Sequence, residues 1–156
     1  MINFTISQLA GSLAEHLAPS FEGVAFYEDP VQQGTDLPAM FLQTRGASIQ
    51  NRMGKRFLWT LRLDLVYLLD FNLPNLQQLY QAAAQILDLK LEVFTYMDPD
   101  GNYSIVRTYN RDWTIDLDEL HYRFDLQSWV TKEEAAELMR TLELNMEVRD
   151  GEEVQD

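Results

Sequence analysis

The sequence predicts a single α+β domain, in which a mainly antiparallel sheet with one long hairpin carries amphipathic helices packed on one of its faces. The chain has 156 residues, a length that fits one domain rather than two. Of these residues 46% are apolar, which is enough for one core. Segments with helical spacing of apolar residues alternate with segments in which every second residue is apolar. The apolar residues fall on one stripe of each helix and one face of the clearest strand, which is typical of a sheet covered on one side.

The first helix is predicted to begin after Thr5. Thr5 and Gln8 have the spacing of a capping box, in which the two side chains bind free amide groups of the first turn. Apolar residues recur at helical spacing as far as Leu17, and Pro19 ends the segment. The expected buried stripe consists of Ile6, Leu9, Ala10, Leu13 and Leu17.

A short strand over residues 24–27 leads into the connection YEDPVQQGTDLPAMF, residues 27–41. This connection contains three acids, two prolines, two glutamines and a glycine before it ends in the apolar pair Met40 and Phe41. Its composition fits an active-site loop, a ligand-binding loop, or a turn that carries the chain into a sheet. The choice depends on whether other parts of the chain offer catalytic partners.

Residues 39–49 and 57–69 are predicted to form two long strands joined around residues 51–54. Every second residue of the later segment is apolar, from Phe57 to Leu69. At about 3.3 Å per residue such a strand spans about 43 Å, against the usual ~17–20 Å. The hairpin therefore either projects to reach a neighbouring protein or bends around its own core.

A second helix is predicted to begin at residues 75–78, with Asn75 as its cap and an apolar stripe that continues to Leu87. Two strands, residues 91–97 and 103–113, follow around a turn, and a further strand covers residues 120–130.

The last part of the chain is predicted to contain a third, short helix capped by residues 131–134. Leu144, Met146 and Val148 alternate as a short strand behind it. The domain is therefore expected to cover residues 1–148, and residues 149–156 form an acidic tail that we expect to be mobile.

The charges are unevenly distributed along the chain. The net charge of −13 disfavours nucleic-acid binding unless the few bases cluster. Five of the twelve bases lie between Arg45 and Arg62, whereas residues 133–156 contain nine acids and two bases. This pattern fits an ordinary solvated surface, or a molecule with one basic and one acidic side that contacts copies of itself head to tail.

The chain lacks the residue patterns of common catalytic and metal sites. It has no cysteine, and His16 and His121 lack the spacing of metal ligands. No serine is flanked by the glycines of a nucleophile elbow. Residues 98–102 predict a hairpin turn rather than a calcium loop, and the acids of residues 112–119 predict a solvated turn. We therefore expect no enzyme, no cofactor and no metal.

The N-terminal segment does not have the features of a targeting signal. It lacks the basic region and the continuous apolar core of a signal peptide, and no stretch approaches the ~18 apolar residues of a membrane span. A soluble protein without membrane contact is the expectation.

The connection also contains a sequence pattern. A motif of one protein family is matched here in order and spacing by Tyr27, Glu28, Val31, Gln33, Gly34, Pro38 and Phe41. Together with the helix before it and the hairpin after it, this segment resembles the tail-terminator family of phages and phage-like contractile particles. The similarity continues through RFLWTLRLDLVYLLD, the middle helix and the later strands.

The resemblance implies a structural protein without catalysis that assembles as a hexameric ring on the head-proximal end of a tail tube. The ring would stop tube polymerisation and join the tube to the neck. The implied partners are further copies of the chain, the tail tube protein, neck or connector proteins and, in contractile tails, the sheath. DNA would pass through the lumen without specific binding. The implied location is the tail of a virion or phage-like particle, assembled in the host cytoplasm.

Contacts with other subunits or with the tube are expected at the polar residues of the connection and at the basic and aromatic residues of the hairpin. These residues are Glu28, Asp29, Gln32, Gln33, Arg45, Arg52, Lys55, Arg56, Phe57 and Trp59. The cluster formed by Arg52, Lys55 and Arg56 also fits nucleic-acid contact, although the net charge opposes it. The alternatives are another head–tail joining, neck or tube subunit, a small ligand-binding regulatory domain, and, with least support, a hydrolase that uses the acids of residues 112–119.

Overall fold

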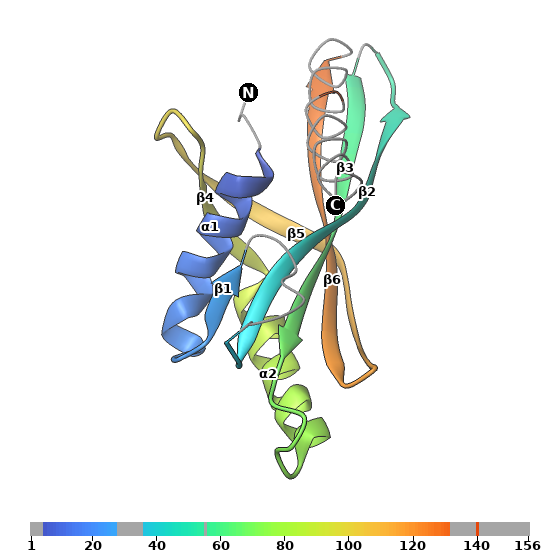
Figure 1. Ribbon diagram of the computed structural model, residues 1–156. Helices are drawn as coiled ribbons and strands as arrows, with labels where there is room; N and C mark the ends of the chain where they lie inside the picture. The colour runs from blue at the N-terminus through green and yellow to red at the C-terminus, as the bar shows by residue number, and fades with distance from the viewer. Residues whose placement is uncertain (1–4, 28–35, 55, 132–139, 141–156) are drawn as a thin grey trace, which may run out of the picture.

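The computed structural model describes residues 5–27, 36–54, 56–131 and 140. Within these residues a six-stranded sheet packs against two α-helices (Figure 1). The strand order across the sheet is β1-β2-β3-β6-β5-β4. The elements in chain order are α1 (Ile6–Leu17), the 3-10 turn η1 (Ala18–Ser20), β1 (Ala25–Tyr27), β2 (Ala39–Asn51), β3 (Arg56–Leu68), α2 (Leu76–Lys90), β4 (Val93–Met97), β5 (Tyr103–Asp116) and β6 (Glu119–Thr131).

The sheet is mixed, because an edge strand that pairs in parallel adds to the antiparallel pairings that the sequence predicts. β1 pairs with β2 in parallel, with Ala25 opposite Ala39 and Tyr27 opposite Phe41. The other four pairings are antiparallel.

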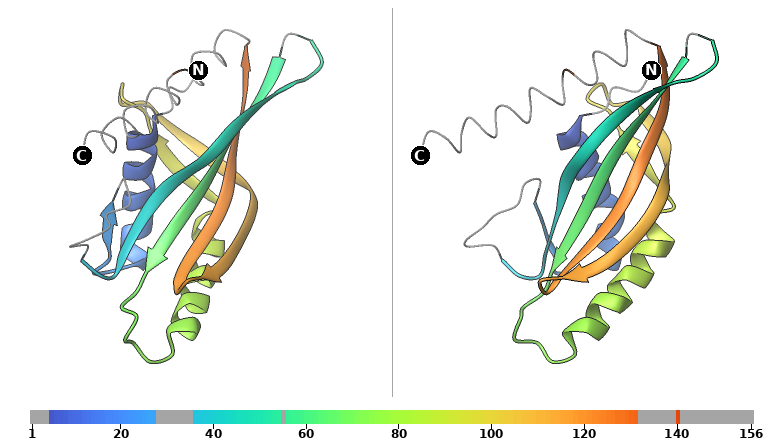
Figure 2. Two further views of the ribbon diagram at one scale, coloured as in Figure 1. Left: turned by 45° about the vertical axis from the view of Figure 1, so that its right-hand side comes forward. Right: turned by 90° about the vertical axis from the view of Figure 1, so that its right-hand side faces the viewer.

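The long hairpin is present, and a third strand supports it over its full length. β2 and β3 pair from Ala39 and Leu68 to Asn51 and Phe57. β6 follows β3 from Tyr67 as far as Arg56, which lies opposite Thr131. The upper part of this three-stranded ribbon extends beyond both helices, and its lower part curves over them (Figure 2). The hairpin thus combines the projecting and the bent arrangements that the sequence allows.

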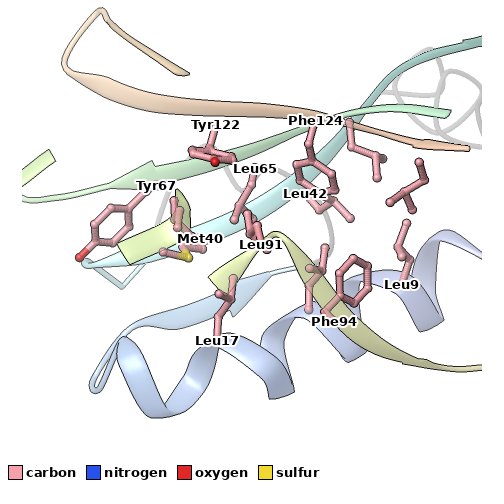
Figure 3. Packing of buried hydrophobic residues seen from close by; sticks show 14 of the residues in the cluster. Leu9, Leu17, Met40, Leu42, Leu65, Tyr67, Leu91, Phe94, Tyr122 and Phe124 are labelled. Carbon is pink, nitrogen blue, oxygen red and sulfur yellow. The ribbon is translucent and has the colours of Figure 1, made fainter. Parts of the chain in front are cut away.

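A single core lies between the sheet and the two helices. The α1 residues Leu9 and Leu17 point toward Met40, Leu42 and Leu65 of the sheet (Figure 3). Leu91 and Phe94 pack between the helix and the sheet. The same cluster includes Tyr80, Ala83, Ala84 and Leu87 of α2 and the alternating residues Leu120, Tyr122, Phe124 and Leu126 of β6. Burial of each large apolar side chain contributes about 1.5–3 kcal/mol, so this cluster holds the layers together.

The two described helices begin in different ways. The Gln8 amide donates to Thr5 Oγ1 at 3.2 Å, which confirms Thr5 as the cap of α1. The other half of the predicted capping box is wrong, because the Thr5 amide donates to the Tyr96 hydroxyl at 3.1 Å rather than to the Gln8 side chain. The prediction that Asn75 caps α2 by its side chain is wrong, although the helix itself begins at Leu76. Asn75 has a left-handed conformation with φ 61°, and its side chain makes no capping hydrogen bond. Asparagine is one of the few residues that adopt this conformation readily.

The predicted third helix falls on residues that lie, apart from Thr131 and Arg140, outside the described residues. The short strand around Leu144 and the tail of residues 149–156 lie outside them as well. Thr131, predicted to start the helix cap, is the last residue of β6.

Candidate functional site

Five of the predicted contact residues lie on the β2–β3 hairpin. Arg45, Arg52 and Arg56 are exposed, and Phe57 is half-buried. Trp59 is only 3% exposed, because its side chain is on the core face of β3. The structure therefore brings the arginines to the surface of the projecting ribbon and places the tryptophan beneath it. Glu28, Asp29, Gln32, Gln33 and Lys55 lie outside the described residues.

Arg45 and Arg62 lie where the hairpin changes register. The pairing of β2 with β3 shifts between Thr44 and Gly46, which leaves Arg45 as the extra residue of a bulge. Arg62 packs over Gly46, so a Cβ atom at position 46 would come within 3.3 Å of the guanidinium. The Arg62 guanidinium also donates to Ser48 Oγ at 3.3 Å. Glycine at position 46 thus leaves room for an arginine on the outer face of the ribbon.

The tip of this ribbon is basic and partly apolar. We call residues 49–54, 56–58 and 129–131 the hairpin end. The Arg52 amide donates to the Arg56 carbonyl at 3.1 Å and closes the turn, and Arg52 Nη2 donates to Gln50 Oε1 at 2.7 Å. Met53 is 95% exposed and Trp129 is 54% exposed. The charged residues of this set are Arg52 and Arg56, with no acid among them.

The opposite end of the sheet is acidic and also partly apolar. We call residues 69–75 and 116–119 the turn end. Its charged residues are Asp70, Asp116, Asp118 and Glu119, with no base among them. Phe71 is 59% exposed, and Leu117 at the tip of the β5–β6 turn is 85% exposed.

The β5–β6 turn at this end has an unusual backbone. Asp116 pairs with Glu119, and the two residues between them, Leu117 and Asp118, have φ values of 51° and 59°. This is the geometry of a type I′ hairpin turn, which strongly favours asparagine and glycine. A leucine in the left-handed region costs about 1–2 kcal/mol. The surrounding structure therefore has to hold this turn in place.

The Tyr80 hydroxyl holds the turn. It accepts a hydrogen bond from the Leu69 amide at 2.9 Å and donates one to the Asp118 carbonyl at 2.7 Å. Burial, the larger effect, raises the pKa of Tyr80, and the nearby Glu119 and Asp118 raise it further against the opposing effect of the Leu69 amide. The hydroxyl consequently keeps its proton and remains a donor. One buried side chain of α2 thus positions both segments of the turn end.

A polar network covers the outer face of the sheet between the two ends. His121 on β6 has Nδ1 2.8 Å from Asp64 Oδ2 on β3 and Nε2 3.0 Å from Glu119 Oε2. Asp64 is 7% exposed, and its Oδ1 is buried without a hydrogen-bond partner. The network was not predicted. The alternating polar residues of both strands were visible in the sequence, but their pairing across 57 residues was not.

The other candidates for chemistry have structural roles in the described residues. The Asp98 carboxylate accepts from the amides of Asp100 and Asn102 within the β4–β5 turn, which confirms a hairpin turn at this position. His16 Nε2 lies 2.6 Å from the Lys90 carbonyl and joins the ends of the two helices. The Asp112 carboxylate lies 3.6 Å from Arg123 Nε. No group of three metal-ligating residues is found in the part of the chain that the structure describes.

One cavity of about 300 Å³ lies between α1 and the strands β1 and β2. Its lining is mainly apolar and includes Ala10, Leu13, Phe26 and Met40. This volume is at the lower end of the range of about 300–1,000 Å³ in which small-molecule sites fall. Among the described helices, none is long and apolar enough to cross a membrane.

Comparison with known proteins gives one match. The model of a family described as "Phage tail terminator protein" matches residues 8–151, nearly the whole chain. The search of curated proteins gives no match.

Proposed function

The chain belongs to the phage tail terminator family, and from this membership we propose that it forms a ring that caps the head-proximal end of a tail tube. The ring stops tube polymerisation and joins the tube to the neck. The observation that carries the proposal is the family match over residues 8–151. The membership itself assigns the protein a structural role in the tail, where it interacts with other tail components.

The shape of the molecule supports a role in assembly. The ribbon of β2, β3 and β6 extends beyond the helices and carries exposed arginines at its tip, so it reaches surfaces that the body of the domain does not (Figure 1). We propose that Arg45, Arg52, Lys55 and Arg56 contact a neighbouring subunit or the tube. Phe57 and Trp59 support the ribbon from its inner face.

The connection before β2 is the second proposed contact. Glu28, Asp29, Gln32 and Gln33 lie in the segment that follows β1, an edge strand of the sheet. An edge strand presents unpaired backbone groups, which makes this side of the sheet available for contact with another chain.

The proposed assembly has further components. Six copies per ring follow from the resemblance to the family, and the sheath is an additional partner if the tail contracts. The lumen lets DNA pass without binding it, because a strongly acidic protein repels a polyanion.

Binding to the tube tests this proposal. Mass photometry of the purified protein, alone and with pre-assembled tube, is expected to give a discrete multimer that binds to tube ends. A stable monomer that binds no tube would contradict the ring. A multimer that binds the portal or connector but no tube would instead identify a head–tail joining subunit.

A further inference from the structure

We infer that the two ends of the sheet bind each other between copies: the hairpin end of one subunit docks on the turn end of the next subunit. The inference rests on the self-association in the proposed function and specifies the surfaces that make it. The two ends lie at opposite extremes of the molecule (Figure 1). A contact between them joins two different surfaces, and such a contact builds a closed ring when the rotation between successive subunits closes.

The first argument is electrostatic. The described residues of the hairpin end carry two bases and no acid, and those of the turn end carry four acids and no base. In a chain of net charge −13 a group of described residues that holds bases and no acid is an exception. Opposite charges favour the contact between unlike ends, and like charges disfavour a two-fold dimer in which an end meets its own copy.

The second argument is the exposure of large apolar side chains at both ends. Met53 and Trp129 are exposed at the hairpin end, and Phe71 and Leu117 are exposed at the turn end. Exposed apolar side chains with charged residues around them are typical of protein–protein contacts, and tryptophan is enriched among the residues that dominate binding energy. Each end therefore has two exposed large apolar side chains, together with charges that complement those of the other end.

The third argument is the strained turn. Leu117 combines an unfavourable backbone conformation with an 85% exposed side chain, so in the isolated subunit neither feature stabilises the fold. Strained residues that the surrounding structure holds firmly cluster at functional sites. The Tyr80 hydroxyl fixes this turn through the Asp118 carbonyl. Presentation of Leu117 to the next subunit accounts for both features.

Cysteine cross-linking tests the contact, because the chain has no cysteine of its own. The double variant Met53→Cys/Leu117→Cys is treated with a short thiol-reactive cross-linker, free and bound to tubes, and analysed on denaturing gels. A ladder that extends beyond the dimer is expected, because each subunit has one thiol at each end. The single variants should remain monomers on the gel, because in a contact between unlike ends a single thiol has no thiol opposite it.

The matched control is Met53→Cys/Leu89→Cys. Leu89 is as exposed as Leu117, at 81%, but lies near the C-terminal end of α2, about 20 Å along the helix from Leu76. The control is expected to give no ladder. An equal ladder from both double variants, or none from Met53→Cys/Leu117→Cys on tubes that it caps, would overturn the inference. In the second case the proposed function would stand.

Charge reversal tests the complementarity separately. Arg52→Glu/Arg56→Glu makes both ends acidic, and Asp116→Lys/Asp118→Lys makes the turn end less acidic by reversing two of its four acids. Mass photometry on tubes should find at least tenfold less multimer for either variant alone. In an equal mixture the amount of multimer should recover, because the acidic hairpin end of one variant meets the reversed turn end of the other. Unchanged multimer for the single variants, or no recovery in the mixture despite wild-type thermal stability, would contradict the docking. Failure of the wild-type protein to bind tubes would contradict the proposed function instead.

Discussion

At the scale of single residues, the Tyr80 hydroxyl links the core of the protein to its acidic end. It is fully buried, and it bonds to the Leu69 amide and the Asp118 carbonyl. Leu69 and Asp118 are 49 residues apart in the chain, and their two segments carry all the acids of the turn end. One buried hydroxyl therefore ties both segments of the acidic end to α2.

Replacement of this hydroxyl is expected to destabilise the protein. Tyr80→Phe leaves the Leu69 amide and the Asp118 carbonyl without their partner, which costs about 1–3 kcal/mol. Urea unfolding, followed by circular dichroism, measures the change in the free energy of unfolding. Tyr103→Phe, at a 72% exposed tyrosine, is the control and should leave it unchanged. Equal stability of the two variants would show that the hydroxyl does not hold the turn.

Relief of the backbone strain at Leu117 is expected to stabilise the protein, in contrast to the loss of the Tyr80 hydroxyl. Leu117→Asn/Asp118→Gly installs the sequence that a type I′ turn prefers and should raise the free energy of unfolding by about 1 kcal/mol. If Leu117 is a contact residue, the same variant should assemble less well than the wild type. A variant that is less stable than the wild type would refute the account of the strained turn. A more stable variant with unchanged assembly would remove Leu117 from the contact.

Single residues also differ in how well the sequence predicts them. The role of Thr5 was predictable because a cap depends on residues three positions apart. The role of Asn75 was not, because its side chain fits a cap and a left-handed turn equally well, and the neighbouring structure decides between them. Tyr80 was predicted only as one apolar position of a helix, since its partners come from two distant segments.

At the scale of elements, the strands β3 and β6 are joined on both faces. Their apolar residues share the core, and on the outer face His121 lies between the carboxylates of Asp64 and Glu119. The imidazole ring thus bridges two acidic side chains on the outer face of the sheet.

Removal of the ring should therefore be costly. His121→Leu leaves the buried Asp64 carboxylate without a partner and should lower the free energy of unfolding by about 1–3 kcal/mol. Asp64→Leu/His121→Leu removes both groups and should recover most of the loss, because an apolar pair replaces a buried polar pair at little cost. Thermal and urea unfolding of the two variants measure this difference. A double variant that is less stable than the single one would contradict the account.

Most helices and strands were predictable from the sequence, but the pairing of strands that are far apart in the chain was not. Alternation in residues 57–69 and the turn signals at residues 51–54 and 98–101 placed the two hairpins close to their observed positions. The parallel pairing of β1 with β2, and the pairing of Leu61 with Leu126, depend on packing between segments far apart in the chain. The bulge at Arg45 was also missed, because it depends on the space that Gly46 leaves for Arg62.

At the scale of the whole molecule, the fold has one core and two exposed ends of opposite charge. The sheet curls around α1 and α2 (Figure 2), and the paired strands β3 and β6 run from the basic hairpin end to the acidic turn end. The sequence predicted the class of protein, through residues 27–41, and the cluster of bases. It did not predict the acidic end, because residues 69–75 and 116–119 come together through the pairing of β3 with β6 and through Tyr80.

The length of tail tubes tests the central claim most directly. Tubes assembled in cells that produce the tail proteins are measured by negative-stain electron microscopy, with and without this protein. Termination at the head-proximal end predicts tubes of one uniform length when the protein is present and a broad distribution of longer tubes when it is absent. The same uniform length in both samples would contradict the claim that this protein ends tube growth.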